Sequence, residues 1–305
     1  MWTRPRVTWK ELLSRTAREC IEDRLLDQAA TLAFYFLLSV FPLLLFLIAL
    51  LGMFLRSGDG LRETLHAYLS TLVPATASSL VDNTLAQITS GSGALRVSVA
   101  LVFTWWSACQ GMLALVQGLN VAYGVRESRP WWRLYLLASG LTLLLLLLVA
   151  GGLLALIEGE RAAKALMDLT GQRTLVVAIW RALQVALTLA LALTAVNVLY
   201  RRAPDIERPS WNWLMPGTLV GVALWVAVSF GFKLYLTFFD NFSLIYGSIG
   251  AVIVLLLWFS LSGLAILVGG EFNSEIEKAA APGAHAHAGA EPGSIGTPNR
   301  AAPLS

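Results

Sequence analysis

Apolar residues occur along this chain in long runs separated by polar segments. Six runs are long enough to cross a ~30 Å hydrocarbon layer as helices that rise about 1.5 Å per residue. They cover residues 31–55, 98–121, 134–157, 175–199, 214–238 and 244–268. Most of the segments between them are too short to hold a soluble domain. The pattern therefore predicts an all-α fold, a polytopic membrane helix bundle with six transmembrane helices.

Three further segments accompany the six-span domain, which is expected over residues 31–273. Residues 1–30 predict a cytoplasmic interfacial amphipathic helix: Thr8 and Glu11 fit a capping box, and apolar residues recur at helical spacing at Leu13, Ala17, Ile21 and Leu25. Residues 56–94 form an outer segment with amphipathic helical pieces. Residues 274–305, rich in Ala, Gly and Pro from residue 279 onward, are expected to be a disordered cytoplasmic tail.

The charge distribution predicts the orientation. The chain is 57% hydrophobic and 13% charged, with a mean hydropathy of +0.68. Lys and Arg are concentrated in the N-terminal segment and in the polar segments after the second and fourth spans. By the positive-inside rule, both termini are cytoplasmic. The net charge of +3 then reflects topology, and no nucleic-acid partner is predicted.

One phrase occurs twice. Residues 120–132 read NVAYGVRESRPWW, and residues 197–211 read NVLYRRAPDIERPSW. Both copies follow a span that runs from the outside to the inside. Asn is expected to cap helix carbonyls, Tyr and Trp to anchor at the interface, and Arg-Pro to stop the helix. The repetition is open to two interpretations: a duplicated two-helix hairpin, or the common residue preferences of the interface.

Small residues predict close helix contacts. The fourth span has Ala178, Ala182, Ala186, Ala190 and Thr194 at every fourth position, and the fifth has Gly217 and Gly221. Another helix can approach closely along such a face.

Four stretches carry a resemblance to a known family: residues 29–52, 119–132, 216–236 and 246–277, the last reading YGSIGAVIVLLLWFSLSGLAILVGGEFNSEIE. Together they resemble the YihY/BrkB family of bacterial inner-membrane proteins. The resemblance implies a multi-pass protein of the bacterial cytoplasmic membrane. It implies no defined activity, because the ribonuclease BN label once attached to the family is thought to be mistaken.

The residue inventory argues against an enzyme, and against a nuclease in particular. Phosphodiester hydrolysis needs clustered metal ligands or an acid–base pair. The chain has three histidines, His66, His285 and His287, and its acidic residues are scattered. Glu127, Asp205 and Glu207 lie among arginines, which predicts ion pairing. The sequence therefore predicts no catalytic residues, no metal site and no cofactor.

Polar residues inside the spans indicate a candidate pathway, because they need polar partners or water in the membrane. The candidate translocation-path residues are Tyr35, Ser39, Pro42, Ser107, Gln110, Gln117, Asn120, Gln184 and Asn197. Pro42 also frees the carbonyl of Leu38. Glu271 and Asn273, in the sequence GGEFN, are candidates for a cytoplasmic gate. The alternative is that these side chains only bond helix to helix.

Two functions follow as hypotheses. The first is translocation of a small solute or a lipid through a polar face of the bundle. The alternative is a non-transporting envelope scaffold or adaptor that uses the outer segment to bind a partner. The lipid bilayer is a predicted partner of the protein. The sequence predicts neither the identity of the substrate nor the oligomeric state.

Overall fold

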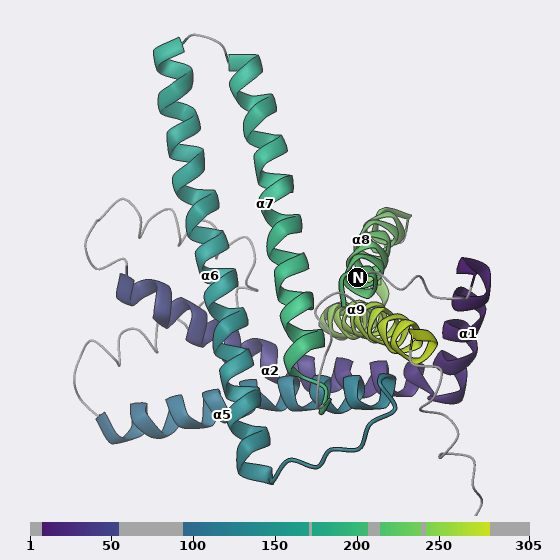
Figure 1. Ribbon diagram of the computed structural model, residues 1–305. Helices are drawn as coiled ribbons and strands as arrows, with labels where there is room; N and C mark the ends of the chain where they lie inside the picture. The colour runs from purple at the N-terminus through teal and green to yellow at the C-terminus, as the bar shows by residue number, and fades with distance from the viewer. Residues whose placement is uncertain (1–7, 55–93, 171–172, 207–213, 239–241, 281–305) are drawn as a thin grey trace, which may run out of the picture.

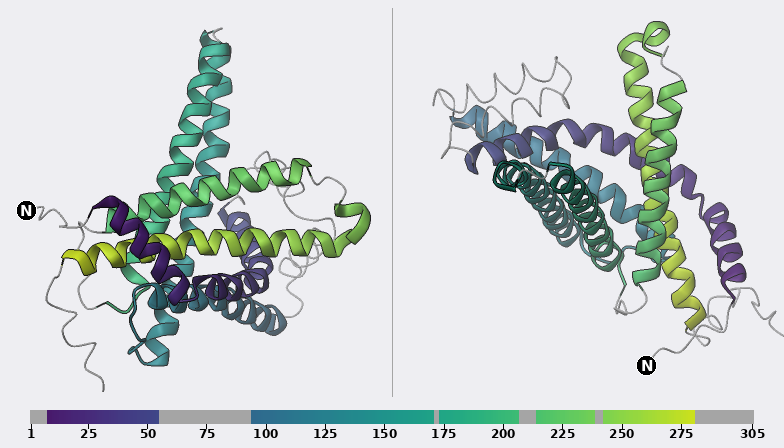
Figure 2. Two further views of the ribbon diagram at one scale, coloured as in Figure 1. Left: turned by 90° about the vertical axis from the view of Figure 1, so that its right-hand side faces the viewer. Right: turned by 90° about the horizontal axis from the view of Figure 1, so that it is seen from above.

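The computed structural model describes residues 8–54, 94–170, 173–206, 214–238 and 242–280, and every regular element in these ranges is an α-helix. In chain order the helices are α1 (Trp9–Glu22), α2 (Leu25–Phe54), α5 (Ala94–Ala122), α6 (Trp131–Thr170), α7 (Arg173–Arg202), α8 (Leu214–Phe238) and α9 (Phe242–Ala280). Helix α2 packs along α5, α6 along α7, and α8 along α9. Figure 1 shows the first two pairs from the side, and Figure 2 shows α8 beside α9. The prediction of an all-helical protein is confirmed for these ranges.

The three pairs diverge from a common meeting point. In Figure 1 the α6/α7 pair rises from it and the α2/α5 pair runs to the left, while Figure 2 shows that α8 and α9 extend in a third direction. The sequence predicted a helix bundle, and the described helices are packed as splayed pairs. We call the meeting point the junction; it contains the last turns of α5, α7 and α9 and the first turns of α2, α6 and α8.

The main hydrophobic core lies at the junction. Leu25 and Leu32 from α2, Leu119 from α5, Tyr200 from α7 and Leu267 from α9 are almost completely buried in one cluster. Glycine allows these helices to approach: a Cβ at Gly118 would lie 3.0 Å from Leu267 Cδ2. Because side chains from all three pairs interdigitate here, the junction sets how the pairs are arranged.

The N-terminal helix begins where its sequence predicts but ends at Glu22, within the segment 1–30 that was predicted to be one helix. The Thr8 hydroxyl accepts a hydrogen bond from the Glu11 N–H at 3.4 Å, which confirms the predicted N-cap. The chain then turns sharply at Arg24, whose φ of 53° lies in the left-handed region, and α2 begins at the next residue. The buried face of α1 is Leu12 and Thr16, whereas Leu13 and Ile21 of the predicted apolar face are exposed. The contact of that face with the membrane surface stays a prediction.

Four of the described helices are long and apolar enough to cross a membrane: Trp131–Leu169, Arg173–Arg202, Pro216–Thr237 and Val252–Ala279. These correspond to the predicted third to sixth spans. The predicted first and second spans coincide with α2 and α5. The structure describes only part of the side chains of these two helices. Within α2, the described stretch Leu25–Val40 is apolar but shorter than a span.

Two helices are longer than predicted. Helix α6 continues to Thr170 through residues 158–170, which were expected in a loop, because ion pairs such as Lys164–Glu160 at 2.9 Å support the added turns. Helix α9 continues to Ala280 into the predicted tail, where Lys278 pairs with Glu275 at 2.8 Å. Most of the outer segment and the tail from residue 281 lie outside the described residues, as do all three histidines.

Candidate functional site at the helix junction

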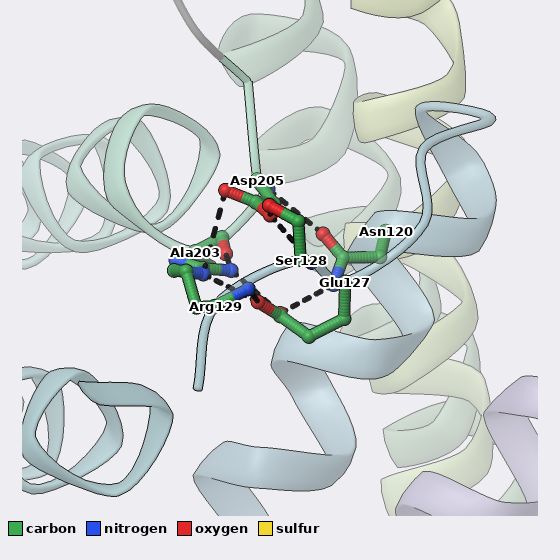
Figure 3. A network of polar contacts seen from close by, with 6 residues as sticks. All are labelled: Asn120, Glu127, Ser128, Arg129, Ala203 and Asp205. Atoms are coloured by element: carbon green, nitrogen blue, oxygen red, sulfur yellow. Dashed lines mark hydrogen bonds and ion pairs between the residues drawn. The ribbon is translucent and has the colours of Figure 1, made fainter. Parts of the chain in front are cut away.

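The two copies of the repeated phrase meet at the junction and bind one another (Figure 3). Asn120, at the end of α5, is buried; its amide donates to Glu127 Oε2 at 2.9 Å, and its carbonyl accepts from the backbone N–H of Asp205 at 2.9 Å. The predicted role of this Asn, capping helix carbonyls, is therefore wrong for its side chain. Asn120 joins the segment after α5 to the segment after α7.

Arg129 completes this contact from the first copy. Its guanidinium binds both oxygens of Glu127, at 2.6 and 2.8 Å, and donates to the carbonyl of Ala203 at 2.8 Å. It also lies 3.6 Å from Asp205, which accepts in turn from the backbone N–H and hydroxyl of Ser128. The ion pairing predicted for Glu127 and Asp205 is confirmed, whereas Glu207 lies outside the described residues.

These contacts keep both carboxylates ionised. The Arg129 guanidinium is the main cause that lowers the pKa of Glu127, and the hydrogen bond from Asn120 lowers it further. Hydrogen bonds from Ser128 lower the pKa of Asp205, with a smaller contribution from Arg129. Carboxylates bound in this way are poor general acids and bases near neutral pH. The arrangement is that of a structural clasp.

The tyrosines of the two phrases both lie against Gly270 on α9, and Tyr200 also lies against Gly269. Tyr200 is fully buried and donates from its hydroxyl to the carbonyl of Ile266 at 2.6 Å. A Cβ at Gly270 would lie 3.5 Å from the Tyr123 ring and 3.7 Å from the Tyr200 ring. A Cβ at Gly269 would meet the Tyr200 hydroxyl and lie 2.7 Å from the carbonyl of Gly217 on α8. The repeated Tyr thus holds α5 and α7 on α9.

The backbone after the repeated Tyr differs between the two copies. After Tyr123 the chain leaves the helix at Gly124, whose φ of 62° permits a tight turn. The second copy has Arg201 at the matching position, and α7 continues to Arg202. Arg-Pro was expected to stop the first helix; instead the carbonyl of Pro130 accepts from the Leu134 N–H at 3.2 Å and starts α6. The two copies share contacts but differ in local geometry.

The two candidate gate residues lie in the junction. The side-chain oxygen of Asn273 accepts from the backbone N–H of Gly217 at 2.8 Å, which fixes the start of α8 on α9. Glu271 is completely buried, with Lys278 Nζ 3.7 Å from its Oε1. The predicted small-residue contacts at Gly217 and Gly221 are confirmed, because both pack against α9 or the Tyr200 hydroxyl.

The candidate path residues of α2 and α5 are largely bonded to backbone. The Ser39 hydroxyl donates to the carbonyl of Tyr35 at 2.7 Å, and Ser107 donates to the carbonyl of Leu38 at 3.4 Å. This is the carbonyl that Pro42 leaves free, so α5 supplies the partner that α2 lacks. Tyr35 and Pro42 are half-buried. The structure brings these residues together in helix–helix contacts.

The remaining candidates are spread over two pairs. Gln110 is half-buried, and Gln117 is exposed between buried neighbours on α5. Gln184 and Asn197 are half-buried on α7, which packs on α6 and α8. The structure therefore does not place the α7 residues on the α2/α5 pair. Arg129 and Tyr200 were not among the predicted site residues, although both stand in the repeated phrase.

Helices of this length and apolarity, held together at one buried junction, define a helical membrane protein. The chain belongs to the family described as Virulence factor BrkB, whose model matches residues 16–293. This finding confirms the resemblance noted from the sequence.

Named relatives agree with this assignment. The chain is 34% identical to a Bacillus subtilis (strain 168) protein described as ribonuclease-like, YfkH, over 83% of this chain and 90% of the relative. It is 29% identical to a UPF0761 membrane protein of Aliivibrio fischeri (strain ATCC 700601 / ES114), over 89% of this chain and 84% of the relative. A UPF0761 membrane protein of Laribacter hongkongensis (strain HLHK9) is also 29% identical, and 59% of its length is covered. No solved structure matches the chain.

Proposed function

We propose that the protein translocates an amphipathic lipid along the outward face of α5, with a small solute as the second candidate substrate. This face consists of Phe103, Trp106, Gln110 and Gln117, which lie within about 60° of one another at ~100° per residue. Gln117 is the residue that carries the proposal, because it is exposed while residues 112–116 and 118–120 are buried.

An exposed amide at this position needs polar surroundings. Transfer of an amide from water to hydrocarbon without a hydrogen bond costs roughly 4 kcal/mol or more. Ser39 and Ser107, in contrast, satisfy their hydroxyls on the backbone of α2. Water or a lipid head group beside Gln117 would remove this cost.

The rest of the face suits the apolar part of a lipid. Phe103 and Trp106 are 63% and 49% exposed, and their ring centroids lie 5.8 Å apart. From Phe103 to Gln117 the face is about 21 Å long at 1.5 Å per residue. An acyl chain would lie along the aromatic rings, and the head group would bind the two glutamines nearer the junction.

The proposed topology has six spans and both termini in the cytoplasm, with the junction on the cytoplasmic side. It rests on the concentration of Lys and Arg around α1 and in the segments after α5 and α7. We do not extend the description of the Bacillus relative as ribonuclease-like to this chain, because Glu127 and Asp205 are bound by Arg129 and Ser128.

Cysteine accessibility tests the proposal first. In a background without Cys20 and Cys109, Gln117→Cys is exposed to a membrane-impermeant thiol reagent from each side of sealed vesicles. We expect labelling, because a thiol in contact with water ionises and reacts. Leu144→Cys is the matched control. Leu144 is 39% exposed within the apolar run of α6, so a cysteine at this position is expected to face lipid and to remain unlabelled.

Lipid movement is then measured directly in reconstituted vesicles with a fluorescent phospholipid that is quenched only in the outer leaflet. We expect Gln117→Leu to slow the movement at least fivefold and Gln184→Leu, the same change on α7, to leave it unaltered. Protection of Gln117→Cys from both sides in folded protein, or no movement by the wild type of lipids or solutes, would contradict translocation. That result would favour the scaffold hypothesis instead.

A further inference from the structure

Helix α1 is fixed on the last turns of α9 by apolar contacts. Leu12 is buried with Phe272 and Ile276, and the Trp9 ring stacks on the Phe272 ring with centroids 6.3 Å apart. One turn further along α1, Thr16 is buried and donates to the carbonyl of Leu12 at 3.0 Å. The same face of α1 then continues to Glu19 and Asp23, seven and eleven positions after Leu12.

Three carboxylates converge where this face meets α9. One oxygen each from Glu19, Asp23 and Glu271 lies within 4.8 Å of the others. Glu19 and Asp23 are partly exposed, whereas Glu271 is completely buried. Three carboxylates this close repel one another unless one of them takes up a proton or a positive charge lies between them.

The carboxylate of Glu271 is incompletely satisfied. Neither of its oxygens has a hydrogen-bond partner in the described part of the chain. Lys278 Nζ lies 3.7 Å from Oε1 but 2.8 Å from Glu275, and its charge also acts on Asp23 and Glu19, so this one ammonium is shared among four carboxylates. Arg18 reaches Glu19 only at 3.8 Å, from a side chain that is 68% exposed. A fully buried carboxylate without a hydrogen bond is rare and costly, and it leaves room for a further positive partner besides Lys278.

We propose that Glu19, Asp23 and Glu271 together bind one divalent cation larger than Mg²⁺, which fastens α1 to α9. The ligands are carboxylate oxygens, which hard cations prefer. Oxygens on opposite sides of a Ca²⁺ ion lie up to about 5 Å apart at 2.3–2.6 Å from the metal, compared with about 4.2 Å for Mg²⁺. The three oxygens lie within 4.8 Å of one another, a separation that one Ca²⁺ ion can span. Because Glu19 and Asp23 are partly exposed, the ion has a route from solvent and room for water ligands.

Calorimetry on the full chain in detergent tests the site with Ca²⁺ as the probe. We expect one Ca²⁺ per chain, a higher melting temperature with Ca²⁺, and at least fivefold weaker binding of Mg²⁺. Glu271→Gln and Asp23→Asn should each weaken Ca²⁺ binding at least tenfold and remove the shift in melting temperature. Glu22→Gln is the matched control: it removes the same charge one residue from Asp23, on a side chain that is 58% exposed, and should change the affinity less than twofold.

Several results would overturn the site. These are the absence of Ca²⁺ binding to the wild type, wild-type affinity in both Glu271→Gln and Asp23→Asn, or an equal loss in Glu22→Gln. Mg²⁺ binding as tight as that of Ca²⁺ would refute the proposed ion size. Asp23→Asn keeps the test decisive if Glu271→Gln does not fold, since Asp23 lies at the end of α1. The readout is cation binding, so it is independent of lipid translocation.

Discussion

The junction and the far half of the α6/α7 hairpin differ in how far their large side chains are buried. At the junction, side chains such as Tyr200, Leu119 and Leu267 are fully buried, and glycines let helix backbones touch. In the far half, which comprises residues 158–170 of α6 and 173–183 of α7, large apolar side chains are exposed, including Leu166, Leu169, Leu175, Ile179 and Leu183. The junction joins the three helix pairs to one another. The far half of the hairpin is a single helix pair whose large apolar side chains are exposed.

The contrast shows where the fold tolerates change. Gly269 at the junction faces the backbone of α8, with the Gly221 Cα 2.7 Å from an added Cβ. The nearest neighbour of a Cβ at Gly159 in the hairpin is the ring of Trp180, a half-buried side chain that can rotate. Backbone in a packed core cannot move locally, whereas an aromatic ring at the surface can. Mutations at the junction should therefore affect the whole molecule.

The largest effect is expected from Gly269→Ala. The new methyl group would lie 2.7 Å from both the Gly217 carbonyl and the Gly221 Cα, and it would also meet the Tyr200 hydroxyl. We expect a loss of about 3 kcal/mol in the free energy of unfolding, because α8 and α9 must separate to accommodate it. Denaturation in mixed micelles measures this change.

Gly140→Ala is the control for this substitution. It adds the same methyl group to α6, where no atom lies within 4 Å of the new Cβ. Alanine favours a helix over glycine by up to ~1 kcal/mol, so this variant should be as stable as the wild type or more stable. Equal destabilisation by the two changes would show that the junction is not packed as described.

A smaller effect is expected from Arg129→Ala in the clasp between the two phrases. The change removes the contacts to Glu127, Ala203 and Asp205 and leaves two carboxylates without their arginine. We expect a loss of about 2 kcal/mol in the free energy of unfolding. Arg126→Ala, at an exposed position of the same segment, should cost less than about 0.5 kcal/mol.

The effect of Arg129→Ala should depend on pH. Because the pKa values of Glu127 and Asp205 are lowered in the folded state, their contribution is fully present above their ordinary values of 4.5 and 3.8. It declines as the pH falls below these values and is lost below the lowered folded values. The difference between wild type and variant should therefore shrink in acid. A difference that stays constant from pH 7 to about pH 3 would contradict the clasp.

Much of the fold follows from local signals. The apolar runs predict the long helices, and Thr8 with Glu11 predicts where α1 begins. The helix ends are less predictable: α6 extends to Thr170 through residues 158–170, in which paired charges such as Lys164 and Glu160 alternate with good helix formers such as Ala and Leu. The alanine face of the fourth span shows a further limit. Ala178, Ala182 and Ala186 are exposed, because small residues permit a close contact without requiring a partner.

The candidate site depends on contacts between distant parts of the chain. The repeated phrase contains the residues of this contact, but the bonded residues are far apart in the sequence. Ser128 and Asp205 are 77 positions apart, and Asn120 and Asp205 are 85 positions apart. The acidic cluster combines Glu19 and Asp23 near the start of the chain with Glu271 near its end. No local spacing encodes such a group, so a sequence without related chains cannot predict it.

The smallest effect is expected from Gly159→Ala, which tests the hairpin side of the comparison. The atoms nearest to the new Cβ belong to the Trp180 ring, and we expect rotation of that ring to relieve the contact. The helix propensity gained by alanine, up to ~1 kcal/mol, opposes the cost of moving the ring, so the net change should stay within about 1 kcal/mol.

Gly151→Ala, eight residues earlier on α6 with no atom within 4 Å of its Cβ, isolates the propensity gain. The difference between these two variants, measured by the same denaturation, gives the cost of displacing Trp180. If that difference approached the loss expected for Gly269→Ala, the far half of the hairpin would be packed as firmly as the junction. The distinction between one rigid centre and three diverging pairs would then be wrong, because an exposed pair that tolerates no added methyl group behaves as part of a core.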